Sequence, residues 1–209
     1  MARVEAGVRA ALNALRYRNV SYRSVVLGDV EVAPSASVGP GCVLKADEES
    51  RIVIGPNVEV QRECRLFARN GGEVRIRDGA TIKEGTKIMP HEKGFAGSAT
   101  IGEGTVLHRN NSLDITGDIT IGRDVRTGEH SYIHTHTHPV DDIEEIWDRE
   151  PTLGSVTVGE GCWIGTMCQL MPGSEMPAHS VLAAGGVATD AFDTRGVFGG
   201  VPAERIKDI

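Results

Sequence analysis

Three histidines stand at alternate positions in the stretch "SYIHTHTHPVDD", residues 131–142, namely His134, His136 and His138. The whole chain has 7 histidines, so nearly half of them lie within residues 134–138. A neutral imidazole can act as a general base near neutral pH, and its nitrogens are also common zinc ligands. The pattern is compatible with a catalytic base, a metal site or a solvated strand, and the direction of each side chain decides among these.

The segments around the histidines follow a six-residue period. Neither an α-helix, with 3.6 residues per turn, nor a strand, with a period of 2, produces such spacing. Triangular coils of three short strands do produce it, with one inward aliphatic side chain on each side, as in the hexapeptide repeats of parallel β-helices. An aliphatic residue or methionine recurs at every sixth position through Val158, Ile164, Leu170, Met176, Leu182 and Ala188. The same spacing recurs upstream in groups of three, from Val32 onward.

This repeat predicts an all-β chain, with about seven coils between Val32 and Thr189. We expect a short amphipathic helical segment over 1–19, a β-helix over 20–193 and a C-terminal tail over 194–209. Extra residues at 50–53, 72–75, 94–100, 119–120 and 139–157 each follow the third hexad of a coil, so all should emerge from one corner. The longest insertion begins directly after His138, and loops on a rigid scaffold often carry function.

The same frame predicts where the histidines and cysteines point. Ile133 is an inward position, so the three histidines that follow at odd offsets should all face outward along that side. A metal site remains an alternative, but the acidic residues after His138 lie in a loop without regular ligand spacing, and we expect no metal. The cysteines share the small slot four residues after an inward position and should be buried free thiols: Cys42, Cys64, Cys162 and Cys168.

Composition narrows the class of protein. A net charge of −7 argues against a nucleic-acid or anionic-membrane partner. No apolar run approaches the roughly 20 residues of a membrane span, and the first residues lack a signal-peptide core. The expectation is therefore a cytoplasmic protein without a membrane span.

Several motifs resemble those of hexapeptide-repeat acyltransferases, in particular the maltose, galactoside and Nod-factor O-acetyltransferases. They are "ITIG" at 119–122, "THPV" at 137–140, "VTVGEGCWIG" at 156–165, "MPGSEM" at 171–176 and "GVPAERI" at 200–206. The resemblance implies a left-handed β-helix that assembles as a homotrimer, with acetyl-CoA as co-substrate in the cleft between neighbouring subunits. It also implies that the histidine of the "THP" stretch, His138, is the catalytic base.

The resemblance carries over to further positions. It places Trp163 beside the pantetheine arm, Thr166 and Ala184 in the CoA cleft, Thr189 near the cofactor's phosphate end, and Asn111 in the active site. Two simpler interpretations stay open: Trp163 as a surface aromatic residue at a subunit contact, and Asn111 as a structural residue at a corner.

The chain departs from the family pattern at the adenosine end of CoA. Asp190 stands where relatives often carry lysine, and Glu204 replaces a commonly basic residue. The resemblance therefore leaves Arg205 and Lys207 to meet the 3′-phosphate.

The resemblance implies transfer of an acetyl group from acetyl-CoA to a hydroxyl of a saccharide or saccharide-linked metabolite. An N-acyltransferase acting on an amino sugar or nucleotide sugar, and an O-acetyltransferase acting on an antibiotic, are alternatives that use the same base. A γ-class carbonic anhydrase would share the fold, but it needs three zinc-binding histidines across a subunit interface, and its characteristic stretches are absent. A non-catalytic β-helix is the remaining alternative.

Overall fold

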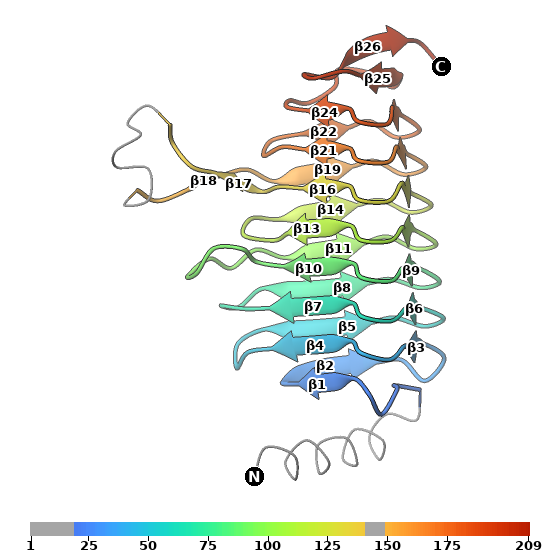
Figure 1. Cartoon of the computed structure of the whole chain (residues 1–209), viewed down its shortest axis with the longest axis vertical. Helices are drawn as coiled ribbons and strands as arrows, with labels where there is room; N and C mark the ends of the chain where they lie inside the picture. Colours follow the sequence, from blue (N-terminus) through green and yellow to red (C-terminus); the bar gives the residue numbers. More distant parts are fainter. Residues whose placement is uncertain (1–18, 141–148) are drawn as a thin grey trace.

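The computed structural model describes residues 19–140 and 149–209. Short strands wind into an elongated β-helix of about seven turns, with β1 near one end and β26 at the other (Figure 1). The described residues contain no α-helix, and the predicted all-β class is confirmed. The helical segment predicted over 1–19 lies, except for Asn19, outside the described residues. No helix in the described part is long and apolar enough to cross a membrane.

Three parallel sheets form the sides of the β-helix. The first contains β1 (Val25–Leu27), β4 (Val43–Ala46), β7 (Arg65–Ala68), β10 (Lys87–Met89), β13 (Ser112–Asp114), β16 (Tyr132–Ile133), β21 (Gln169–Leu170) and β24 (Val187–Ala188). The second contains β2 (Asp29–Val32), β5 (Arg51–Ile54), β8 (Glu73–Ile76), β11 (Ala99–Ile101), β14 (Ile119–Ile121), β19 (Val156–Val158) and β22 (Glu175–Met176).

The third sheet runs along the remaining side. It contains β3 (Ser37–Val38), β6 (Glu59–Val60), β9 (Thr81–Ile82), β12 (Val106–Leu107), β15 (Arg126–Thr127), β20 (Trp163–Ile164), β23 (Val181–Leu182) and β25 (Val197–Gly199). The tail closes this sheet with β26 (Glu204–Lys207), which pairs antiparallel to β25.

The aliphatic residues of the six-residue period form the core. In the first sheet the strand register stacks Leu44 on Leu66, Ile88 on Leu113 and Leu113 on Ile133, and each of these side chains is at most 3% exposed. Burying one such side chain contributes about 1.5–3 kcal/mol. Because every coil supplies the same inward positions, the repeats bury one continuous apolar column.

The cysteines fill the interior as predicted. All four are buried and free, so Cys42 and Cys64, in neighbouring coils, are not joined by a disulfide. Burial raises the pKa of the Cys162 and Cys168 thiols, which keeps them protonated and unreactive near neutral pH.

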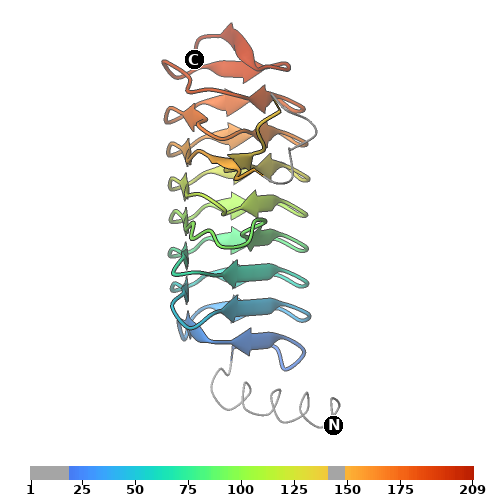
Figure 2. The same cartoon turned by 90° about the vertical axis from the view of Figure 1, so that its left-hand side faces the viewer.

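The insertions emerge from one corner, between the first and second sheets, as predicted (Figure 1). They begin a few residues earlier than predicted, because the last residues assigned to the insertions belong to strands of the second sheet. The chain leaves β10 at Pro90, for example, and enters β11 at Ala99. Proline has no N–H to continue the strand ladder. The longest insertion contains β17 (His136–Thr137) and β18 (Thr152–Leu153), which pair antiparallel. Figure 2 faces this side of the molecule.

Candidate active site

Three successive coils bring a cluster of titratable side chains together at this corner. Glu92 lies in the excursion after β10, Asp114 ends β13 in the next coil, and His136 begins β17 in the coil after that. Strands β10, β13 and β16 are neighbours in the first sheet, so the residues that follow them are stacked above one another. Residues distant in sequence therefore meet because each has a similar place in its own coil.

Asp114 and His136 form the closest pair in this cluster. The Asp114 Oδ2 and His136 Nδ1 atoms are 2.5 Å apart, and the Asp114 side chain is only 1% exposed. The carboxylate also accepts hydrogen bonds from the Thr116 hydroxyl, at 2.6 Å, and from the His91 N–H, at 3.1 Å. Asp114 is thus a buried acceptor with several donors aimed at it.

These donors keep Asp114 ionised. Burial by itself would raise the pKa of this carboxyl, but the hydrogen bonds from Thr116 and His136 outweigh it and hold the pKa below its usual value. An ionised carboxylate only accepts hydrogen bonds, so the Nδ1 atom of His136 carries a proton. In the neutral imidazole, the lone pair then resides on Nε2, on the far side of the ring from Asp114.

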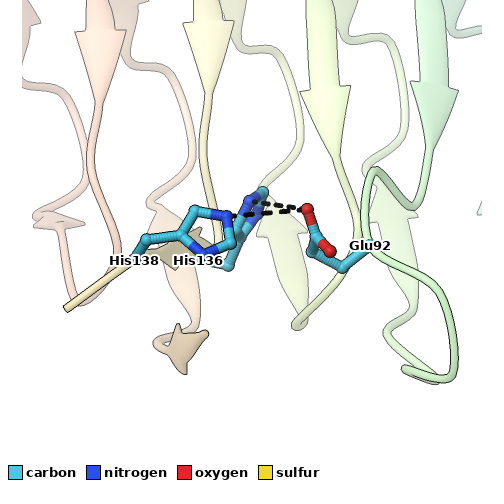
Figure 3. Close-up of side chains that lie close together, drawn as sticks. All are labelled: Glu92, His136 and His138. Carbon is cyan, nitrogen blue, oxygen red and sulfur yellow. Dashed lines mark ion pairs between the residues drawn. The ribbon is translucent and has the colours of Figure 1, made fainter. Parts of the chain in front are cut away.

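The second nitrogen of His136 faces Glu92, and so does His138. The Nε2 atoms of both histidines lie 3.7 Å from Glu92 Oε1, and Figure 3 shows the two rings directed at this one carboxylate. The imidazole planes are nearly perpendicular, at 89°, with centroids 5.5 Å apart. Distances of 3.7 Å are too long for direct hydrogen bonds. The side chains of His136 and His138 are only 12% and 24% exposed.

The His134 side chain lies apart from this cluster. Its ring stacks on that of Tyr132, with centroids 5.9 Å apart and planes 9° from parallel. Burial lowers the pKa of His134 below its usual value, although the Asp114 charge opposes the shift. This imidazole therefore favours its neutral form.

None of the three histidines is part of the core, as predicted, because the buried Ile133 and Thr135 alternate with them, but they do not share one strand: β16 ends at Ile133 and β17 begins at His136. Thr135 is fully buried, and its hydroxyl donates a hydrogen bond to the main-chain carbonyl of Asp114, at 2.7 Å. Strand β16 ends at Ile133, and β17 begins directly after Thr135. His136 and His138 face Glu92, while the His134 ring stacks on Tyr132.

Three residues predicted to bind CoA line a second feature. Trp163, Thr166 and Ala184 surround a mainly apolar hollow of about 350 Å³ between β20 and β23, with Val181 and Leu182 among its other lining residues. Trp163 is 60% exposed, an unusual state for so large an aromatic side chain. The mostly apolar lining suits an apolar ligand segment.

The structure does not bring the predicted phosphate-end residues into this hollow. The Thr189 hydroxyl donates to its neighbour Asp190, at 2.9 Å. The Arg205 guanidinium bonds to Asp208, at 2.9 Å, and to main-chain carbonyls of the tail, while Lys207 is exposed on β26. Their role at a 3′-phosphate stays a prediction.

Asn111 lies inside a corner of the β-helix. Its Nδ2 donates to the His108 carbonyl at 2.6 Å, to Thr127 Oγ1 at 3.0 Å and to the Gly128 carbonyl at 3.0 Å, and its Oδ1 accepts from the Ser131 N–H at 3.1 Å. The side chain is 2% exposed. These bonds occupy the amide and favour the structural interpretation of Asn111 over the catalytic one.

We therefore expect Asn111→Ala to act on stability. The substitution leaves several buried polar groups unpaired and should cost about 1–3 kcal/mol or more. The thermal unfolding midpoint of the variant checks this, with Gln169→Ala, an exposed amide on β21, as control. An unchanged midpoint together with a large loss of turnover would instead place Asn111 in the chemistry.

Sequence reasoning missed Glu92 and Asp114. The signal that could have found them is their spacing, since 114 − 92 and 136 − 114 both equal 22 residues. Once the coils are recognised, residues one coil apart fall at the same corner. The signal is weak without the structure, because the coils differ in length.

Comparisons with known proteins agree with this fold. A scan against models of protein families finds no match. The chain is 29% identical to a probable acetyltransferase of Mycobacterium tuberculosis over 159 residues, which are 75% of this chain but only 50% of that protein. It is 29% identical to the galactoside O-acetyltransferase of Escherichia coli over 132 residues, 62% of this chain and 64% of that enzyme.

A solved structure shows the same architecture. A hexapeptide-repeat acetyltransferase of Vibrio cholerae, crystallised with acetyl coenzyme A, superposes with a TM-score of 0.53 at 23% identity, over 63% of this chain and 71% of its own. Together with the six-residue repeat and the motifs around His138 and Trp163, these similarities confirm the resemblance. In its repeat, its motifs and its fold, the chain is similar to hexapeptide-repeat acetyltransferases.

Proposed function

We propose that this protein transfers an acetyl group from acetyl-CoA to a hydroxyl of a saccharide or saccharide-linked metabolite, with His138 as general base. The observation that carries the proposal is the apolar hollow lined by Trp163, Thr166 and Ala184, the positions that the resemblance assigns to CoA. The similarity to a galactoside O-acetyltransferase supports the choice of acceptor.

The residues of the hollow fit the pantetheine arm of CoA. This arm is a narrow chain of methylene and amide groups, and the hollow is lined by the large indole of Trp163 and by the small side chains of Thr166 and Ala184. Exposed aromatic surface of this kind gains stability when a ligand covers it. When bound, acetyl-CoA supplies an activated thioester as the acetyl donor.

The chain itself then has to activate the acceptor. A hydroxyl has a pKa far above neutrality, and in this proposal the His138 imidazole takes its proton as the oxygen attacks. Glu92, 3.7 Å from His138 Nε2, stabilises the positive charge that forms on the ring. Asp114 holds the neighbouring His136 in one orientation and one tautomer. No covalent enzyme intermediate is required.

The positions of the two features support assembly into a homotrimer. The hollow belongs to the third sheet, whereas the histidine cluster lies at the corner between the first two, and the two stand on opposite sides of the β-helix in Figure 1. One chain would hold the donor far from its own His138. A neighbouring copy that presents its hollow to this histidine completes the site.

The acceptor class can be tested directly. Purified protein should consume acetyl-CoA in the presence of at least one member of a panel of sugars, measured by release of free CoA thiol. Acetylation of amino sugars alone would favour the N-acyltransferase alternative, and acetylation of an antibiotic alone would favour the antibiotic alternative. No thermal stabilisation by millimolar acetyl-CoA would contradict the proposal.

Trp163→Ala should weaken the interaction with the donor. Loss of the indole face is expected to raise the KM for acetyl-CoA about 3- to 10-fold, in line with the roughly 0.5–1.5 kcal/mol of an aromatic contact. The KM for the acceptor should change little. Steady-state kinetics at varied acetyl-CoA measures this, with Tyr22→Ala, an exposed aromatic residue elsewhere, as control. An unchanged KM would leave Trp163 with a role only at a subunit contact.

A further inference from the structure

Three potential metal ligands converge at the corner of the β-helix. Glu92 Oε1, His136 Nε2 and His138 Nε2 all lie within 4.8 Å of one another, and each side chain is partly buried (Figure 3). The carboxylate oxygen is 3.7 Å from each nitrogen, so none of these contacts is a direct hydrogen bond. The three atoms therefore surround a common point without saturating one another.

The spacing suits a small divalent cation. Two ligand atoms that each lie about 2.1 Å from a tetrahedral ion are separated by about 3.4 Å. The two 3.7 Å separations from Glu92 exceed that value by little, and all three ligand atoms lie within 4.8 Å of one another. Two histidines and one carboxylate form a ligand set typical of zinc and other divalent transition ions.

Asp114 supplies the second feature of a built site. Metal-binding histidines usually donate their other ring N–H to a carboxylate, which fixes the ring and its tautomer. His136 does so to the buried Asp114, at 2.5 Å. The lone pair on its Nε2 consequently faces the Glu92 oxygen, so two acceptors confront each other. A cation between the His136 nitrogen and the Glu92 oxygen would remove the repulsion between their lone pairs.

We propose that Glu92, His136 and His138 bind one divalent transition-metal ion of the zinc class, and that its occupancy removes His138 from its role as base. The ion and the acceptor's proton compete for the same Nε2 atom, so bound metal switches acetyl transfer off. This goes beyond the proposed function and revises the expectation from sequence that no metal binds. All three ligands come from one chain, unlike the three histidines across an interface of a γ-class carbonic anhydrase.

A zinc titration tests the site without any acetyl acceptor. Metal-free protein is titrated with Zn²⁺ against a chromophoric chelator, and we expect one ion per chain. Glu92→Gln and His138→Ala should each weaken binding about 100-fold or more, and Asp114→Asn about 10- to 100-fold through the orientation of His136. Retained β-structure by circular dichroism and an intact assembly size confirm that each variant is folded.

Matched controls come from elsewhere on the chain. His134→Ala removes the neighbouring histidine outside the cluster, and Glu160→Gln removes a carboxylate that lies 3.6 Å from the exposed His179. Both should bind zinc as the wild type does. The proposed site is overturned if the wild type binds no zinc, or if Glu92→Gln binds it with wild-type affinity.

The second half of the proposal concerns activity. Added Zn²⁺ should reduce acetyl transfer in step with the occupancy measured in the titration, and a chelator should restore it. Stimulation by zinc, or full turnover at full occupancy, overturns the proposed competition. Because the titration needs no acceptor, a failure of the proposed acetyl transfer leaves the result for the metal site unaffected.

Discussion

Replacing His138 with alanine should lower the turnover of acetyl transfer about 10²- to 10⁴-fold, the usual contribution of a general base. The reason is that no other group at this position would take the proton of the acceptor hydroxyl as it attacks. The affinity for acetyl-CoA should survive, because the proposed donor site is the hollow at Trp163 and not the histidine cluster. Steady-state kinetics and calorimetric binding of CoA measure the two effects separately.

The neighbouring histidines provide the controls. His134→Ala should retain most of the turnover, because this ring stacks on Tyr132 outside the cluster. His136→Ala should have an intermediate effect, since it removes the partner of Asp114 and one neighbour of Glu92. If His136→Ala abolishes turnover and His138→Ala does not, the oriented Asp114–His136 pair holds the base. Both measurements use metal-free protein, so that bound ions do not obscure the comparison.

Two inactive variants should restore activity when they are combined. His138→Ala removes the proposed base, and Ala184→Trp fills the hollow with a large side chain. If the base of one subunit works on a donor held by the next, mixed oligomers contain some sites with a normal histidine and a normal hollow. In a trimer that contains both variants, in either ratio, about one site in three has a normal histidine and a normal hollow. Activity should rise from near background to about that fraction of wild type.

The assembly can be made by coexpression of the two variants with different affinity tags, followed by purification on both. The control is a chain that carries both substitutions, mixed with wild type in the same way. This chain contributes neither a normal histidine nor a normal hollow to any site. If coexpressed single variants stay as inactive as either parent, the two features do not act across a subunit interface. A monomer by light scattering would contradict the proposed homotrimer at once.

The architecture follows from the sequence because its cause is local and repeated. Leu113, Ile133 and their equivalents recur in the inward position of every coil, and only a stacked β-helix buries them all in one column. The same regularity predicted the buried cysteines and the common corner of the insertions. The family resemblance singled out Trp163, Thr166 and Ala184, and the structure places them around one hollow because β20 and β23 are neighbouring strands of a regular sheet.

The composition of the histidine cluster was decided by the tertiary structure. His136 meets Asp114 one coil earlier and Glu92 two coils earlier, and both contacts depend on how far each insertion carries the chain from the regular coil. Thr135 continues the alternation that the sequence suggests, since it is buried and bonded to Asp114, but the neighbours of the histidines on either side of it come from other coils. The sequence by itself determined the repeat, the core and the place where the histidines leave it. Only the stacking of three coils with unequal insertions decided which side chains surround them, because no periodic pattern fixes the path of an insertion.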